Sequence, residues 1–117
     1  MKRILVVDDG LFMRSLIKKM LIANGYEIAG EAEDGEAAVE RYRELHPDIV
    51  TMDITMPKQD GVYALEQILS FDPNASVVMV SSLGQEENVK RAIRVGAKGF
   101  VVKPFNEATI MSVINNI

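Results

Sequence analysis

The chain has 117 residues, a formal net charge of −4 at pH 7, and neither cysteine nor tryptophan. We expect residues 1–117 to form one domain with its own core, and the average apolar and charged fractions exclude disordered and membrane-embedded classes. The composition also excludes disulfides and zinc–thiolate sites, and thirteen basic against seventeen acidic residues argue against direct nucleic-acid binding.

Short apolar runs alternate with amphipathic stretches along the whole chain. The runs predict strands at 4–7, 26–30, 48–52, 77–80 and 100–102. The first, fourth and fifth runs are continuously apolar, which is typical of parallel strands that are covered on both faces. The second run is more polar, as expected of an edge strand.

The intervening stretches have helical periodicity and recognisable end signals. They predict helices at 11–23, 35–45, 61–70, 86–95 and 106–117. In the first helix, Phe12, Leu16, Met20 and Ala23 lie near one face, which we expect to cover the sheet. Five strands and five helices in strict alternation predict an α/β fold, a parallel sheet with short right-handed connections.

Polar side chains follow four of the five predicted strands. Asp8 and Asp9 come after the first strand, Asp53 after the third, Ser81 after the fourth and Lys103 after the fifth. Functional groups of open parallel sheets lie beyond the carboxyl ends of the strands. Each residue alone is ordinary loop or helix-cap chemistry, so their joint position carries the prediction of a site.

This set of side chains suits phosphoryl transfer. Three adjacent carboxylates repel one another unless a cation lies among them, and an all-oxygen donor set favours Mg²⁺. One aspartate could then act as the nucleophile toward phosphorus and form an acyl phosphate. Lys103 supplies a mobile positive charge and Ser81 a hydroxyl donor for the phosphoryl oxygens.

The same segments resemble the receiver domain of bacterial two-component response regulators over the whole chain. The similarity is carried by DD at 8–9, MDITMP at 52–57, DG at 60–61 and KPF at 103–105. Segments FMR at 12–14, SSLGQ at 81–85 and GAKGF at 96–100 look most similar to stand-alone CheY-type chemotaxis receivers. The resemblance implies the flavodoxin-like strand order 2-1-3-4-5, with five helices on both faces of the sheet.

The resemblance also implies the acceptor and the metal ligands. Asp53 would be the phospho-acceptor and would contribute to a Mg²⁺ site. Asp9 would bind the ion directly, Asp8 mainly through water, and Thr55 through its backbone carbonyl. Ser82 and Leu83 lie at positions that, with Thr55, would tune the hydrolysis of the acyl phosphate.

The remaining implied roles concern the transmission of the signal. Ser81 would hydrogen-bond the phosphoryl group, and Lys103 would bridge to it. The bond between Lys103 and Pro104 would be cis, and Phe100 would be the switching aromatic residue. The output surface would be the face formed by the fourth helix, the fifth strand and the fifth helix.

We therefore expect a cytoplasmic signalling switch that accepts a phosphoryl group from a sensor histidine kinase. It would catalyse only its own phosphorylation and dephosphorylation, so it would not be an enzyme in the usual sense. Its work would be to bind a protein target, with the flagellar motor switch as one candidate, as a monomer or a weak phosphorylation-dependent dimer without nucleic-acid or membrane contact. Two alternatives stay open: a receiver excised from a larger regulator, such as a DNA-binding transcription factor, and a passive, non-phosphorylated interaction module.

Overall fold

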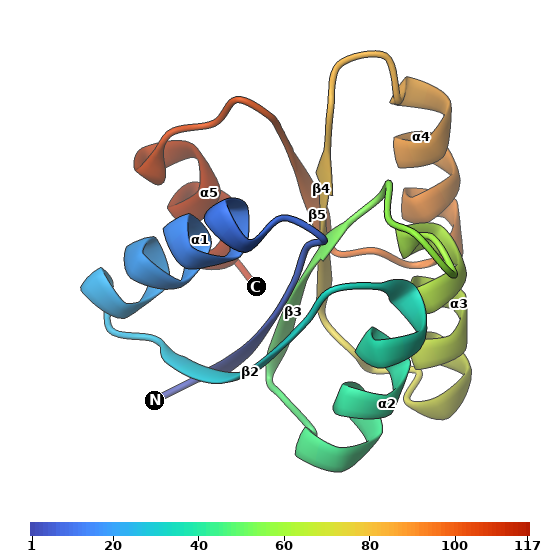
Figure 1. Ribbon diagram of the computed structural model, residues 1–117, viewed down its shortest axis with the longest axis horizontal. Helices are drawn as coiled ribbons and strands as arrows, with labels where there is room; N and C mark the ends of the chain where they lie inside the picture. Colours follow the sequence, from blue (N-terminus) through green and yellow to red (C-terminus); the bar gives the residue numbers. More distant parts are fainter.

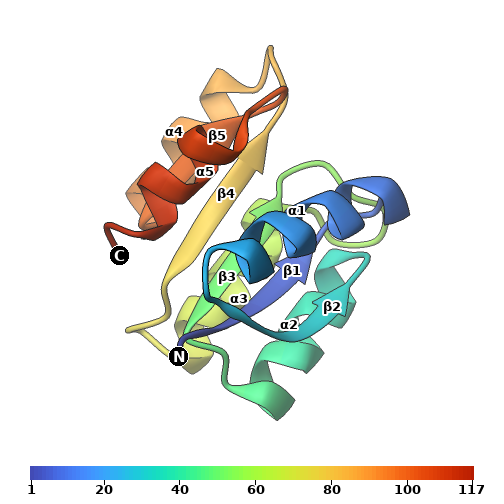
Figure 2. The same cartoon turned by 90° about the vertical axis from the view of Figure 1, so that its left-hand side faces the viewer.

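Five parallel strands form a single sheet in the order β2-β1-β3-β4-β5 in the computed structural model, which describes residues 1–117. The order and the parallel pairing confirm the predicted fold class. Figure 2 shows the sheet with β2 at one edge and β5 at the other. The strands are β1 (Arg3–Val7), β2 (Glu27–Ala32), β3 (Ile49–Asp53), β4 (Val77–Ser81) and β5 (Gly99–Val102).

Five helices cover the two faces of this sheet. Figure 1 shows α1 and α5 on one face and α2, α3 and α4 on the other. None of the helices has the length and apolar character needed to span a membrane. The helices are α1 (Leu11–Ala23), α2 (Gly35–Leu45), α3 (Gly61–Phe71), α4 (Glu86–Val95) and α5 (Glu107–Ile114).

The strand side chains alternate between two apolar cores, one on each face of the sheet. Leu5 and Met52 belong to the larger core under α2, α3 and α4, and Ile4 and Val6 belong to the core under α1 and α5. Because both faces are covered, β1 is buried along nearly its whole length. Strand β2 is partly exposed, as predicted for an edge strand.

Three helices have the predicted ends, the other elements differ from the predictions by one to three residues at one or both ends, and two of these differences matter. Strands β3 and β4 include Asp53 and Ser81 as their last residues, so ladder pairing holds both backbones. The last helix begins only at Glu107, because the side chain of Asn106 accepts a hydrogen bond from the Thr109 N–H at 2.8 Å and caps it.

The buried face of α1 is not the predicted one. Phe12 is 79% exposed, while Ile17 and Leu21 are buried against the sheet. Most of this helix is apolar, so periodicity alone does not define which side faces the core. The rotation is fixed by Arg14, whose guanidinium donates to the backbone carbonyl of Asp8 at 2.7 Å and pairs with Glu31 of β2 at 3.1 Å.

One buried hydroxyl in the sheet has no hydrogen-bond partner. Thr51 lies in β3 between Val6 of β1 and Val78 of β4, and its Oγ1 is fully enclosed. Enclosing an unpaired hydroxyl in an apolar layer destabilises the folded state.

Replacing this hydroxyl by a methyl group is expected to stabilise the protein. Thr51→Val should raise the free energy of unfolding by about 1 kcal/mol, measured by urea denaturation, because valine has a similar shape and no polar atom. The reverse exchange Val101→Thr, at a buried position of β5, should lower it. A less stable Thr51→Val variant would contradict the assignment of Thr51 as unpaired.

Candidate functional site

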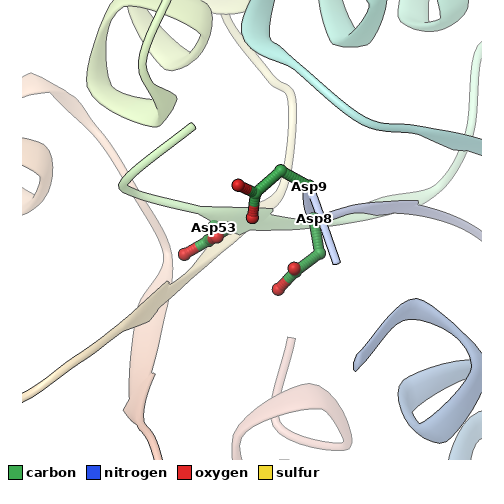
Figure 3. A group of neighbouring side chains, drawn as sticks. All are labelled: Asp8, Asp9 and Asp53. Atoms are coloured by element: carbon green, nitrogen blue, oxygen red, sulfur yellow. The ribbon is translucent and has the colours of Figure 1, made fainter. Parts of the chain in front are cut away.

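Three carboxylates meet where β1 and β3 end. Asp8 and Asp9 follow β1, Asp53 is the last residue of β3, and their carboxylate oxygens lie within 4.8 Å of one another (Figure 3). Asp8 and Asp53 are buried, whereas Asp9 is exposed. The sequence-based expectation that these residues lie together is confirmed.

Close packing of α3 against the end of β3 holds Asp53 in place. A Cβ atom at Gly61 would lie 2.1 Å from the backbone carbonyl oxygen of Asp53, so only glycine fits there. The Gly61 N–H donates to the carbonyl of Ile54 at 2.8 Å, and the Asp60 side chain caps α3 by accepting from the Tyr63 N–H. The DG pair at 60–61 therefore supports the position of Asp53.

The carboxylate of Asp8 is hydrogen-bonded through both of its oxygens. Its Oδ1 accepts from the Gly10 N–H at 2.8 Å, and its Oδ2 accepts from Nζ of Lys103 at 3.0 Å. The same ammonium group lies 3.7 Å from Oδ1 of Asp53, so one cation serves two buried carboxylates. The Lys103 backbone is fixed by its N–H, which donates to the Ser81 carbonyl at 2.7 Å.

The surroundings of Asp53 make its carboxyl group a weaker acid than an ordinary aspartate. Burial and the neighbouring negative charge of Asp8 together raise the pKa of Asp53 to about 6, although the positive charge of Lys103 acts in the opposite direction. The ionised form of Asp53 is thus present at neutral pH but lacks full compensation. An additional positive charge next to Asp53 would stabilise the ionised carboxylate.

The donor set fits a hard divalent cation. All three side chains offer carboxylate oxygens, no histidine or cysteine belongs to the cluster, and the uncompensated charge on Asp53 favours a bound cation. Asp8, Asp9 and Asp53 are the side chains that could hold Mg²⁺. Thr55 follows Asp53 by two residues in the adjoining loop, where its carbonyl could contribute.

The other predicted residues lie on the neighbouring strands. Ser81 is buried at the end of β4, next to β3, and Lys103 follows β5 through a cis bond to Pro104. The resemblance to receiver domains predicted this cis peptide bond, and the structure contains it. Phe100 on β5 does not belong to the carboxylate cluster and is 44% exposed.

A groove beside the carboxylate cluster extends over α4 and β5. The groove has a volume of about 520 Å³, and one of its lining residues, Ser81, lies on β4 beside the strand that carries Asp53. The groove is lined by the residues Ser81, Ser82, Leu83, Glu86, Val89, Lys90, Ile93, Arg94, Phe100 and Val102.

Sequence reasoning gave no role to Gln85, which contacts both loops beside Asp53. Its side chain accepts from the Ser82 N–H at 2.6 Å and donates to Oγ1 of Thr55. No local pattern marks such a residue, because the contact with Thr55 spans 30 positions in the chain.

Comparison with known proteins gives consistent matches over nearly the whole chain. Residues 4–115 match the family described as response regulator receiver domain. Chemotaxis protein CheY of Thermotoga maritima is 49% identical over 99% of this chain and 97% of its own length. Chemotaxis protein CheY of Bacillus subtilis is 51% identical over 97% of this chain and 94% of its own length.

A solved structure agrees in three dimensions. The crystal structure of the CheX-CheY-BeF3-Mg+2 complex from Borrelia burgdorferi contains a chain that is 41% identical, with a TM-score of 0.94. The alignment covers 98% of the present chain and 87% of that chain.

The raised pKa of Asp53 predicts a pH-dependent difference between the parent and Asp53→Asn. Ionising Asp53 costs more in the folded than in the unfolded protein, so this contribution to stability is present below about pH 4 and is lost as the pH rises through about 6. Without divalent cations, Asp53→Asn should be more stable than the parent by about 1–3 kcal/mol at about pH 8, and by almost nothing at about pH 4.

Urea unfolding in EDTA, followed by circular dichroism, measures this difference across the pH range. Glu40→Gln, on the exposed side of α2, is the matched control and should show no comparable gain at high pH. Equal stability of Asp53→Asn and the parent at about pH 8 would contradict the raised pKa.

Proposed function

The chain belongs to the response regulator receiver domain family, and on that premise we propose that it is a signalling switch activated by phosphorylation of Asp53. Members of this family are signalling modules rather than conventional enzymes. The observation that carries the proposal is the position of Lys103 between two buried aspartates, beside a third aspartate and Ser81. These are the groups that phosphoryl transfer to a carboxylate requires.

In the proposed reaction, a carboxylate oxygen of Asp53 attacks the phosphorus of a phosphohistidine on a sensor histidine kinase. The P–O bond to Asp53 forms as the P–N bond to the imidazole breaks, and the imidazole leaves with the electron pair. The attacking form is the carboxylate, which predominates above a pKa of about 6. Because Asp53 is buried and the ladder fixes its backbone, the nucleophile is oriented before the donor arrives.

Lys103 and Ser81 would stabilise the phosphoryl group once it is attached. Nζ of Lys103, already 3.7 Å from Asp53, can exchange a carboxylate for a phosphoryl oxygen with little movement. The hydroxyl of Ser81 supplies a neutral donor from the adjacent strand. Mg²⁺ held by Asp8, Asp9, Asp53 and the Thr55 carbonyl would neutralise the negative charge that gathers there.

The output would be a change in the surface formed by α4, β5 and α5. Ser81 belongs both to the carboxylate site and to the groove whose wall includes Phe100. A shift of Ser81 toward a phosphoryl group opens space for the exposed Phe100 ring to turn inward, and this alters the surface that a target protein contacts.

Several of the relatives point to chemotaxis as the pathway. The relatives from T. maritima and B. subtilis are named chemotaxis protein CheY, and the related chain from B. burgdorferi was crystallised in a complex with CheX. We propose that the present chain is likewise a cytoplasmic chemotaxis regulator. Its partners would be a histidine kinase and a downstream protein, with a CheX-like protein and the flagellar switch as candidates.

Phosphorylation of Asp53 can be tested directly with a small phosphodonor. The parent incubated with acetyl phosphate and Mg²⁺ should gain the mass of one phosphoryl group, and neither Asp53→Asn nor the parent in EDTA should gain it. Intact mass spectrometry makes the measurement. A parent that acquires no adduct would support the passive interaction module instead.

The inward turn of Phe100 can be followed by fluorescence, because the chain has no natural tryptophan. In Phe100→Trp, acetyl phosphate with Mg²⁺ should shift the emission to shorter wavelength as the indole leaves solvent. Adding Ser81→Ala should abolish most of the shift. Phe71→Trp, at the end of α3 and 45% exposed in the parent, is the control and should not respond; an equal response there would refute a movement specific to Phe100.

A further inference from the structure

We propose that Gln85 is a positioning residue that holds together the two loops flanking Asp53, and that this contact couples phosphoryl acceptance to the start of α4. The inference rests on the proposed function, since it concerns the same reaction. We call the contact of Gln85 with Ser82 and Thr55 the amide clasp.

The amide clasp uses both ends of one side-chain amide. Oε1 of Gln85 accepts a hydrogen bond from the backbone N–H of Ser82 at 2.6 Å, within the loop that joins β4 to α4. Nε2 donates to Oγ1 of Thr55, in the loop that joins β3 to α3. One side chain therefore links two loops that are far apart in the sequence.

Both partners of the clasp lie next to the reacting groups. Thr55 is two residues after Asp53, and its backbone N–H acts on the Asp53 carboxylate and partly offsets the rise in its pKa. Ser82 directly follows Ser81, whose carbonyl anchors the backbone of Lys103. The clasp thus restrains the supports of the acceptor and of the cation at the same time, and such supports determine how well a reactive group is oriented.

The position of Gln85 immediately before α4 gives the second half of the inference. Asp34, Asp60 and Asn106 each precede a helix and use a side-chain oxygen to cap it. Gln85 occupies the same position before α4, yet its side chain makes no cap hydrogen bond. The side chain is directed to the two loops instead, so it connects the start of α4 to the site rather than capping the helix.

The first turn of α4 also lines the groove. Glu86, Val89 and Lys90 belong to its wall, together with Ser82 of the clasp. A change at Asp53 that moves Thr55 or Ser82 is therefore transmitted through Gln85 to the groove wall. This route adds Thr55 and Gln85 to the one through Ser81 and Phe100.

The test removes the clasp from either side. Gln85→Leu keeps the size of the side chain and removes both hydrogen bonds, whereas Thr55→Val removes only the acceptor hydroxyl and leaves the bond to Ser82. Asn88→Leu is the matched control, because it deletes an exposed amide from the same turn of α4.

The first readout is the rate of phosphoryl gain from acetyl phosphate and Mg²⁺, followed by intact mass. We expect Gln85→Leu and Thr55→Val each to slow the gain by about three- to tenfold, and Asn88→Leu to stay within about twofold of the parent. The double variant should be no slower than the slower single variant, because both changes break the same contact.

The second readout does not depend on phosphorylation. In ¹⁵N-edited NMR spectra of the unphosphorylated protein, the Ser82 amide resonance should move in Gln85→Leu and keep its position in Asn88→Leu. An unmoved Ser82 resonance in Gln85→Leu, an unchanged rate, or additive slowing in the double variant would each overturn the proposal. A parent that gains no phosphoryl group would refute the proposed function, while the Ser82 resonance would still report whether the clasp exists.

Discussion

The ammonium group of Lys103 pairs with two buried carboxylates, and the arrangement of this end of the molecule depends on that contact. Asp8 and Asp53 could not both be buried as anions without a nearby cation. Lys103 follows β5, whereas Asp8 follows β1, and β4 and β3 lie between these strands. The side chain therefore crosses the end of the sheet and fixes three strand ends relative to one another.

The sheet below this charged edge supplies the rigidity that the site needs. Two apolar cores hold the strands from both faces, and the ladder continues up to Asp53 and Ser81. Close packing at this edge leaves no room for a larger residue next to Asp53, as the contact of Gly61 with the Asp53 carbonyl illustrates. The polar groups of the site thus lie at the strand ends and in the loops that follow them, and packing of the sheet sets their positions.

The carboxylate site and the α4–β5 groove share structural parts. Ser81 belongs to both, and Gln85 connects the loop after Asp53 to the first turn of α4. In the proposed mechanism, a local change of charge at Asp53 reaches the groove through these shared residues.

The sequence alone determined the fold class, because the apolar runs, helix periods and caps such as Asp34 are local features with local physical causes. It also determined that Asp8, Asp9, Asp53 and Lys103 gather at one edge, since parallel strands bring their carboxyl ends together. Only the tertiary structure decided which face of α1 is buried, because that helix is apolar on several sides and Arg14 sets its rotation through distant partners. The raised pKa of Asp53 and the bridge made by Gln85 were likewise decided by tertiary structure, because both arise from distances between residues far apart in the chain.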